Sequence, residues 1–150
     1  MMDESLDDIR YGLSVIHSSE EKRMQSRRLG SSGVYVSDIC MGTMTFGGQC
    51  DTKMSHAICD MAFDAGIDFF DAAEIYPVPP HKDTIGLTEK IFGEWLKGKP
   101  RDSVVVATKV TGPSHGWFNS PVRNGKATLD RHQVVRACED SLRRLGTDVI

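Results

Sequence analysis

The strongest constraint on the fold is a repeated alternation of short apolar segments with longer amphipathic ones over the last two thirds of the chain. Four short strands are expected, at 39–44, 67–73, 103–110 and 148–150. Three helices are expected between them, at 55–65 with Ser55 as the N-cap, 87–97 and 130–145. This order is typical of right-handed βαβ units on a parallel sheet, so the sequence predicts an α/β fold.

Two further features concern the ends of the chain. A Gly/Ser turn within 27–37 predicts a β-hairpin ahead of the first parallel strand. Residues 1–24 have no comparable pattern, and we expect a mobile tail followed by one domain over 25–150. The sequence stops three residues into its last expected strand, which favours a fragment of a larger fold.

Composition excludes several classes of protein. Hydrophobic residues make up 39% and the formal charge is −3, so the chain has an ordinary globular composition and no basic field for nucleic acid. Its longest apolar runs are far shorter than the roughly 18 residues of a membrane span. The four cysteines show no metal-binding or redox spacing, and the acidic start resembles no signal peptide. A reduced cytoplasmic protein is therefore expected.

The chemistry-bearing residues follow the expected strands. In parallel α/β folds ligands meet the carboxyl ends of strands, where this chain has Asp71, Tyr76 and Lys109. A free tyrosine titrates near pH 10, but a lysine ammonium beside the phenol favours the phenolate, and a carboxylate keeps that lysine charged and oriented. Such a tyrosine can protonate a carbonyl oxygen while hydride arrives at carbon.

Each of these residues also has a structural interpretation. Asp71 alone could be a helix cap or the first residue of a loop after a strand, and Tyr76 could be a loop anchor. Lys109 is harder to explain structurally, because it ends an apolar strand. Glu74 is expected to face solvent. The histidines show no ligand spacing, so no metal site is expected, and four of them are interpreted as surface residues: His56, His81, His115 and His132.

Several ordered motifs resemble the first half of the aldo-keto reductase family. They are Gly42-Thr43-Met44-Thr45-Phe46-Gly47, Gly66 to Tyr76, Ala107-Thr108-Lys109-Val110 and Ser141 to Asp148. The Arg28-Leu29-Gly30 turn is similar as well. The segment Tyr76 to Pro80 with Gly86 to Glu89 resembles the branch typified by the bacterial Tas protein. The similarity covers about residues 25–150.

The resemblance implies a (β/α)₈ TIM barrel, of which this chain would supply an N-terminal half-barrel of about four parallel strands. It implies reduction of an aldehyde or ketone by NADPH, with Asp71, Tyr76 and Lys109 as catalytic residues. Gly42, Thr43, Met44 and Asp71 correspond to positions near the nicotinamide ribose. The loop after the third strand often supplies an aromatic wall for substrate, and Trp117 or Phe118 is the candidate here.

The resemblance also leaves alternatives open. The family's fourth catalytic residue, a histidine, and the segments that hold the adenosine phosphate are expected beyond Ile150, so the 150 residues alone are expected to be inactive. Open, apolar strand edges predict poor folding or self-association. A non-catalytic subunit, as in the β subunits of potassium channels, or a half-barrel interaction protein remains an alternative to an enzyme.

Overall fold

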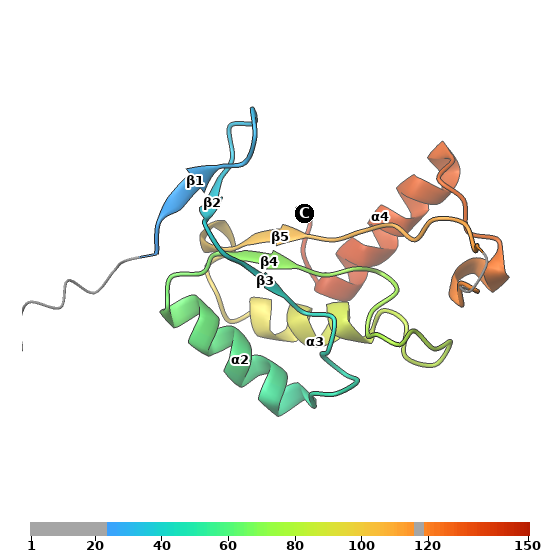
Figure 1. Cartoon of the computed structure of the whole chain (residues 1–150), viewed down its shortest axis with the longest axis horizontal. Coiled ribbons are helices and arrows are strands. Elements are labelled where there is room, and N and C mark those ends of the chain that lie inside the picture. Colours follow the sequence, from blue (N-terminus) through green and yellow to red (C-terminus); the bar gives the residue numbers. More distant parts are fainter. Residues whose placement is uncertain (1–23, 116–118) are drawn as a thin grey trace, which may run out of the picture.

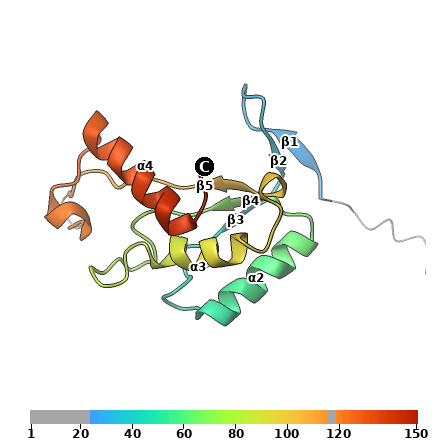
Figure 2. The ribbon, with the colours of Figure 1, turned by 180° about the vertical axis from the view of Figure 1, so that it is seen from behind.

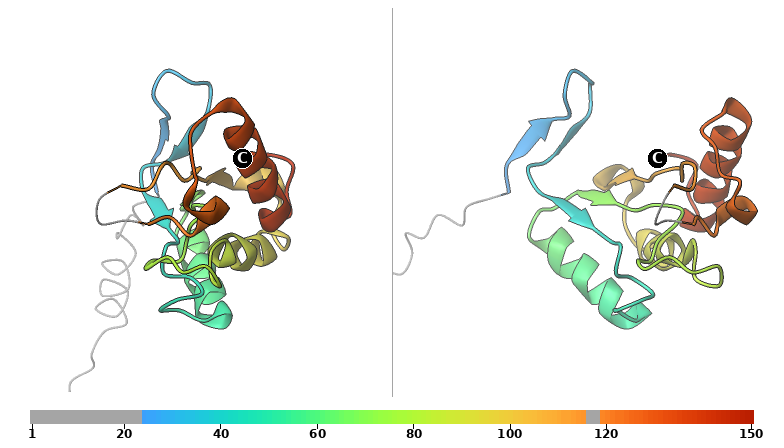
Figure 3. Two further views of the ribbon diagram at one scale, coloured as in Figure 1. Left: turned by 90° about the vertical axis from the view of Figure 1, so that its right-hand side faces the viewer. Right: turned by 45° about the vertical axis from the view of Figure 1, so that its right-hand side comes forward.

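The computed structural model describes residues 24–115 and 119–150. The expected tail therefore lies, apart from Met24, outside the described residues. The hairpin is present: β1 (Ser26–Arg28) pairs antiparallel with β2 (Tyr35–Ser37), with Arg27 opposite Val36. Gly30 lies in its turn at φ 58°, in the left-handed region that favours glycine. The hairpin stands at one end of the molecule, away from the C-terminal helix (Figure 3).

A three-stranded parallel sheet forms the centre of the fold (Figure 1). Its strands are β3 (Cys40–Gly42), β4 (Phe69–Asp71) and β5 (Val105–Ala107), in that spatial order. The register aligns Gly42, Asp71 and Ala107 across the sheet. Each strand thus ends in the same row, and the loops that follow leave the sheet together.

Two helices cover one face of this sheet, as Figures 1 and 2 show from opposite sides. They are α2 (Thr52–Asp64) and α3 (Leu87–Leu96), and α4 (Arg131–Leu145) packs against α3. Gly93 permits the close contact of α3 with α4, because a Cβ built there would lie 2.5 Å from the carbonyl oxygen of Leu145. The sequence therefore needs a glycine at this crossing.

Aromatic side chains build the core between the sheet and the helices. Phe70 from β4 lies 5.2 Å from Phe92 and 5.1 Å from Trp95, measured between ring centroids. Phe92 and Phe70 are fully buried, and Trp95 is nearly so. The other face of the sheet is an open groove of mainly apolar lining, which includes Leu29, Val34, Phe69, Val105, Ala107, Val149 and Ile150.

The fourth expected strand is wrong, and the bounds of the other expected strands and helices differ at one or both ends, with β3 and β4 shorter than the expected 39–44 and 67–73. Residues 148–150 form no strand, and the carbonyl oxygen of Val149 instead accepts a hydrogen bond from Arg101 at 2.5 Å. Helix α2 begins at Thr52 because Asp51, not Ser55, accepts a hydrogen bond from the Met54 amide. The strand expected at 103–110 narrows to Val105–Ala107, since a short 3₁₀ turn, η1 (Arg101–Ser103), precedes it.

The face of α4 also differs from expectation. The apolar residues within 130–145 recur at helical spacing, which predicts a buried face that includes Val134, Val135 and Cys138. All three are exposed. The helix buries Ala137, Ser141 and Leu145 instead, a spacing of four residues that lines one stripe. Two of these three side chains, those of Ala137 and Ser141, are small.

Candidate active site

The carboxyl ends of β4 and β5 bring a carboxylate and an ammonium together. Asp71 is the last residue of β4, and Lys109 follows β5 by two residues. The Lys109 Nζ atom donates to Asp71 Oδ2 at 2.5 Å, and both side chains remain partly exposed. Parallel pairing of the two strands fixes this contact, because Asp71 and Ala107 are register partners. Two of the three expected residues are therefore in direct contact.

Tyr76 reaches the same place from the loop after β4. The Lys109 Nζ atom lies 4.8 Å from the centroid of the Tyr76 ring, within the range of a cation–π contact. The loop is held in two places near the ring: the Tyr76 amide donates to the Ala73 carbonyl, and the Gly86 amide donates to the Tyr76 carbonyl, both at 3.1 Å. The structure thus brings Asp71, Tyr76 and Lys109 into one cluster, as predicted; their roles remain a prediction.

Electrostatics keep the lysine of this cluster charged. Burial alone would lower the pKa of Lys109, but the hydrogen bonds and charges of Asp71 and Tyr76 outweigh it and raise that pKa above its usual 10.5. The ammonium is therefore the form present at neutral pH. A fixed positive charge stands beside a phenol, which is the arrangement needed to stabilise a phenolate.

The segment Gly42–Met44 lies beside Asp71. The Thr43 amide and hydroxyl both donate to the Asp71 carbonyl, at 3.1 and 2.9 Å, and Thr43 is fully buried. Thr43 therefore fixes the position of the Asp71 backbone. A Cβ built on Gly42 would meet no atom within 4 Å, and Met44 is 49% exposed. Space for a ligand exists beside this row, and the contacts expected there remain predictions.

Some expectations about neighbouring residues need correction, and one cannot be judged. Trp117 and Phe118 lie outside the described residues. Glu74 does not face solvent, since it is 4% exposed. His56 is half-buried, and its Nε2 atom lies 2.8 Å from the Ile91 carbonyl oxygen. His81, His115 and His132 are exposed as expected.

Glu74 belongs to one of two buried carboxylate–arginine pairs that sequence reasoning missed. Glu74 pairs with Arg123 at 2.8 Å, and Glu89, also buried, pairs with Arg144 at 2.5 Å. The partners are 49 and 55 residues apart, so no local pattern could have joined them. The sequence shows only that Glu74 lies between Asp71 and Tyr76, in the segment that follows the second expected strand.

Over 24–115 and 119–150, no three His, Cys, Asp or Glu side chains gather in a way that could hold a metal ion. Within the same ranges, no helix has both the length and the apolar character to cross a membrane.

The strand order, the hairpin and the Asp–Tyr–Lys cluster define a class that comparison with known proteins identifies. The model of the aldo/keto reductase family matches residues 38–150, and the chain belongs to that family. It is 44% identical over 128 residues to Protein tas of Escherichia coli, an alignment that covers 85% of this chain and 36% of that protein.

Two other similar proteins bear on function and fold. A probable voltage-gated potassium channel subunit beta from Arabidopsis thaliana is 34% identical over 130 residues, covering 85% of this chain and 35% of the subunit. The holo form of aldo-keto reductase AKR11C1 from Bacillus halodurans superposes with a TM-score of 0.66 at 31% identity. That superposition covers 85% of this chain and 38% of the other. The chain spans little more than a third of the length of these relatives.

Proposed function

We propose that the protein reduces an aldehyde or ketone to an alcohol with NADPH. The observation that carries the proposal is the contact of Lys109 with both Asp71 and the Tyr76 ring at the ends of β4 and β5. Membership of the aldo/keto reductase family supports the same reaction. In this proposal residues 25–150 form the N-terminal part of a (β/α)₈ barrel.

In this proposal each of Tyr76, Lys109 and Asp71 has a separate catalytic role. NADPH, when bound, supplies the hydride. The Tyr76 hydroxyl donates its proton to the carbonyl oxygen as the C–H bond forms, so that the carbonyl becomes an alcohol and the phenol a phenolate. Lys109 stabilises that phenolate, and Asp71 orients the lysine. General acid catalysis of this kind contributes roughly 10²–10⁴-fold to the rate.

The cofactor would lie beside Gly42, Thr43, Met44 and Asp71. The open space at Gly42 and the exposure of Met44 fit a planar ring with its ribose, while the buried Thr43 hydroxyl acts through Asp71. No phosphate-binding residue is proposed within the described segments. We propose that turnover needs the part of the barrel that corresponds to the remaining length of the relatives.

The first measurement is the intact mass of the protein as its own cell makes it, because this decides which chain to assay. NADPH consumption is then followed with a panel of aldehydes and ketones. Tyr76→Phe should abolish turnover with little loss of cofactor affinity, and Lys109→Met should lower turnover by about 10²-fold. Turnover of Tyr76→Phe within about tenfold of the parent would contradict the role of Tyr76.

A non-catalytic subunit is the second candidate, favoured by the likeness to the potassium channel subunit. Such a protein would bind NADPH without consuming it across the whole carbonyl panel. For either function we place the protein in the cytoplasm. The four cysteines support this, because all are free thiols and two, Cys40 and Cys138, are exposed.

A further inference from the structure

Glu74 ties the loop that carries Tyr76 to the segment that carries Lys109. Its amide donates to the Lys109 carbonyl at 3.1 Å, and its Oε1 atom accepts from the Thr111 amide at 2.5 Å. Backbone and side chain of one residue thus hold the chain at the Lys109 carbonyl and two residues later, at Thr111. Glu74 is two residues from Tyr76, so this connection joins the segment that carries the phenol to the segment that carries the ammonium.

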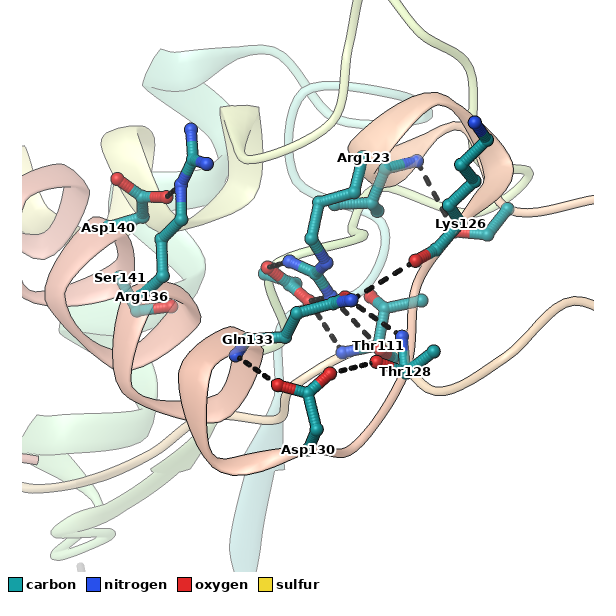
Figure 4. Close-up of polar contacts among 12 residues, drawn as sticks. Thr111, Arg123, Lys126, Thr128, Asp130, Gln133, Arg136, Asp140 and Ser141 are labelled. Atoms are coloured by element: carbon teal, nitrogen blue, oxygen red, sulfur yellow. Dashed lines mark hydrogen bonds and ion pairs between the residues drawn. The ribbon is translucent and has the colours of Figure 1, made fainter.

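Arg123 closes the connection from a third segment. Its Nη1 and Nη2 atoms donate to Glu74 Oε2 and Oε1 at 3.0 and 2.8 Å, and Nη2 also donates to the Thr111 carbonyl at 3.0 Å. The side chains are 15% and 4% exposed for Arg123 and Glu74. A bidentate guanidinium–carboxylate contact fixes direction as well as distance. Figure 4 shows Arg123 extending toward Thr111.

The segment that supplies Arg123 is itself anchored. Arg123 lies in the 3₁₀ turn η2 (Val122–Gly125), which precedes α4. Gln133 of α4 accepts from the Thr128 amide at 2.9 Å and donates to the Lys126 carbonyl at 3.3 Å, as Figure 4 shows. Asp130 caps the helix through the Gln133 amide at 3.1 Å. The arginine therefore extends from a turn attached to a helix end.

The backbone of η2 is unusual at this point. Arg123 has φ 50° and Asn124 has φ 54°, both in the left-handed region. Asparagine tolerates that region, whereas arginine seldom adopts it, and such conformations persist where surrounding contacts hold them. The three hydrogen bonds of the Arg123 guanidinium are contacts of that kind.

The ionisation state of Glu74 also favours its contact with Arg123. Burial alone would raise the pKa of Glu74, but hydrogen bonds from Arg123 and Thr111 outweigh it and lower that pKa below its usual 4.5. Glu74 is thus an anion at neutral pH, paired with a cation that burial also shields from water.

We propose that Glu74 and Arg123 are positioning residues that set the distance between Tyr76 and Lys109. They touch neither the proposed substrate nor the cofactor and act through the backbone of residues 74–76 and 109–111. Their effect on catalysis rests on the proposed function, whereas their effect on the Tyr76–Lys109 geometry does not. A displacement of about 1 Å at a reacting group can cost 10²-fold in rate.

The buried pair Glu89–Arg144 provides a matched control. Glu89 is fully buried, and Arg144 bonds its Oε2 atom and the Ser141 hydroxyl. Arg144 makes none of these contacts with residues 74–76 or 109–111. Arg123→Gln and Arg144→Gln therefore each remove the cation from a buried carboxylate. Only the first removes hydrogen bonds to Glu74 and Thr111. The second leaves in place the separate bond of the Thr108 hydroxyl to Glu89 Oε1, at 2.6 Å.

The test measures geometry in the 150-residue chain by NMR at neutral pH. The ε-methylene protons of Lys109 should be shifted upfield by the Tyr76 ring, and Tyr76→Leu defines the unshifted value. We expect Glu74→Gln and Arg123→Gln to lose at least half of this shift, while Arg144→Gln keeps it. The signals of Phe70, Phe92 and Trp95 show whether each variant retains its core. Arg123→Lys, which keeps the charge, should restore part of the shift and serves as the second variant if Arg123→Gln unfolds.

Two outcomes would overturn the proposal. The Lys109 shift could remain in Glu74→Gln with the core intact, or it could fall equally in Arg144→Gln. In a protein that turns over substrate, Glu74→Gln should lower kcat by tenfold or more with KM within about threefold. Absence of turnover in the parent would count against the proposed function alone, because the NMR measurement does not require it.

Discussion

Replacing Gly93 by alanine should destabilise the fold through one backbone contact. The new Cβ would lie 2.5 Å from the Leu145 carbonyl oxygen and 2.7 Å from its carbonyl carbon and Cα. All three are backbone atoms, so no rotamer change can relieve the contact, and α3 and α4 must move apart by about 1 Å. This separation also loosens the packing of Leu145, which is fully buried.

The change in the free energy of unfolding caused by Gly93→Ala is the sum of two opposing effects. Overpacking of a tight contact costs about 1–3 kcal/mol, and alanine gains up to about 1 kcal/mol over glycine within a helix. Because the contact is with backbone, we take the upper part of the first range, which gives a net loss of about 1–2 kcal/mol. At the usual urea dependence this lowers the unfolding midpoint by about 0.5–1 M.

The assay is urea unfolding followed by the fluorescence of Trp95, in a Trp117→Phe background that leaves a single indole. Gly98→Ala is the matched control, because its Cβ would meet only the Trp95 carbonyl oxygen, at an ordinary 3.5 Å. Its midpoint should stay close to that of the parent. A Gly93→Ala midpoint equal to or above that of Gly98→Ala, with unchanged slope, would refute the packing argument.

Three further predictions address acid, thiols and association. Folding lowers the pKa of Glu74, so its contribution to stability is complete above about pH 4.5 and is lost as the pH falls below that value. The NMR shift of the Thr111 amide proton, which bonds Glu74, should therefore change with a midpoint below pH 4.5. A midpoint above pH 4.5 would contradict the assignment. Burial raises the pKa of the Cys59 thiol to about 12. A thiol reagent at pH 8 should therefore modify the exposed Cys138 in the native protein and leave Cys59 unmodified. Equal modification of the two cysteines would show that the core is open to the reagent. The apolar groove on the open sheet face and the exposed Val135 should cause self-association. In size-exclusion chromatography at two protein concentrations, the apparent mass should rise toward twice that of the monomer at the higher one. Elution as a monomer at both concentrations would contradict this prediction.

The sequence predicted the parallel sheet, the hairpin and the cluster at its edge for one reason. Strands and helices of this chain carry strong local signals, such as the β-branched run Val104–Val106 and the glycine at 146 that ends α4 at φ 65°. Once the strands are parallel, residues at their carboxyl ends must converge. Asp71 and Lys109 therefore meet as a consequence of topology and need no long-range pattern.

The errors arose where neighbouring elements decide the outcome. Ser55 has the side chain of an N-cap, but Asp51 caps the helix four residues earlier by accepting from the Met54 amide. The Ser55 hydroxyl instead donates to the Asp51 carbonyl at 2.7 Å within the helix. On α4 the packing against α3 decides which stripe is buried, so Ala137, Ser141 and Leu145 are buried while Val134 and Val135 stay exposed. Residues 148–150 have strand-like composition, yet Arg101 takes the Val149 carbonyl that a strand would use.

Glu74 was misjudged for a related reason. A charged residue in a loop usually meets water, and only a partner distant in sequence reverses that preference. Arg123 provides the partner through a turn whose left-handed backbone no residue pattern in 121–126 reveals. Buried ion pairs of this kind can be recognised only after the loops have been placed in space.

In both carboxylate–arginine pairs the carboxylate is synthesised before its cation, and this order limits when each glutamate can be buried. Glu74 is made 49 residues before Arg123, and Glu89 is made 55 residues before Arg144. At about 5–20 residues per second, each carboxylate waits roughly three to ten seconds for its cation. Until then neither glutamate can leave water without a large cost. The segments that bear Tyr76 and Lys109 therefore gain their buried ion pair only after Arg123 has been translated.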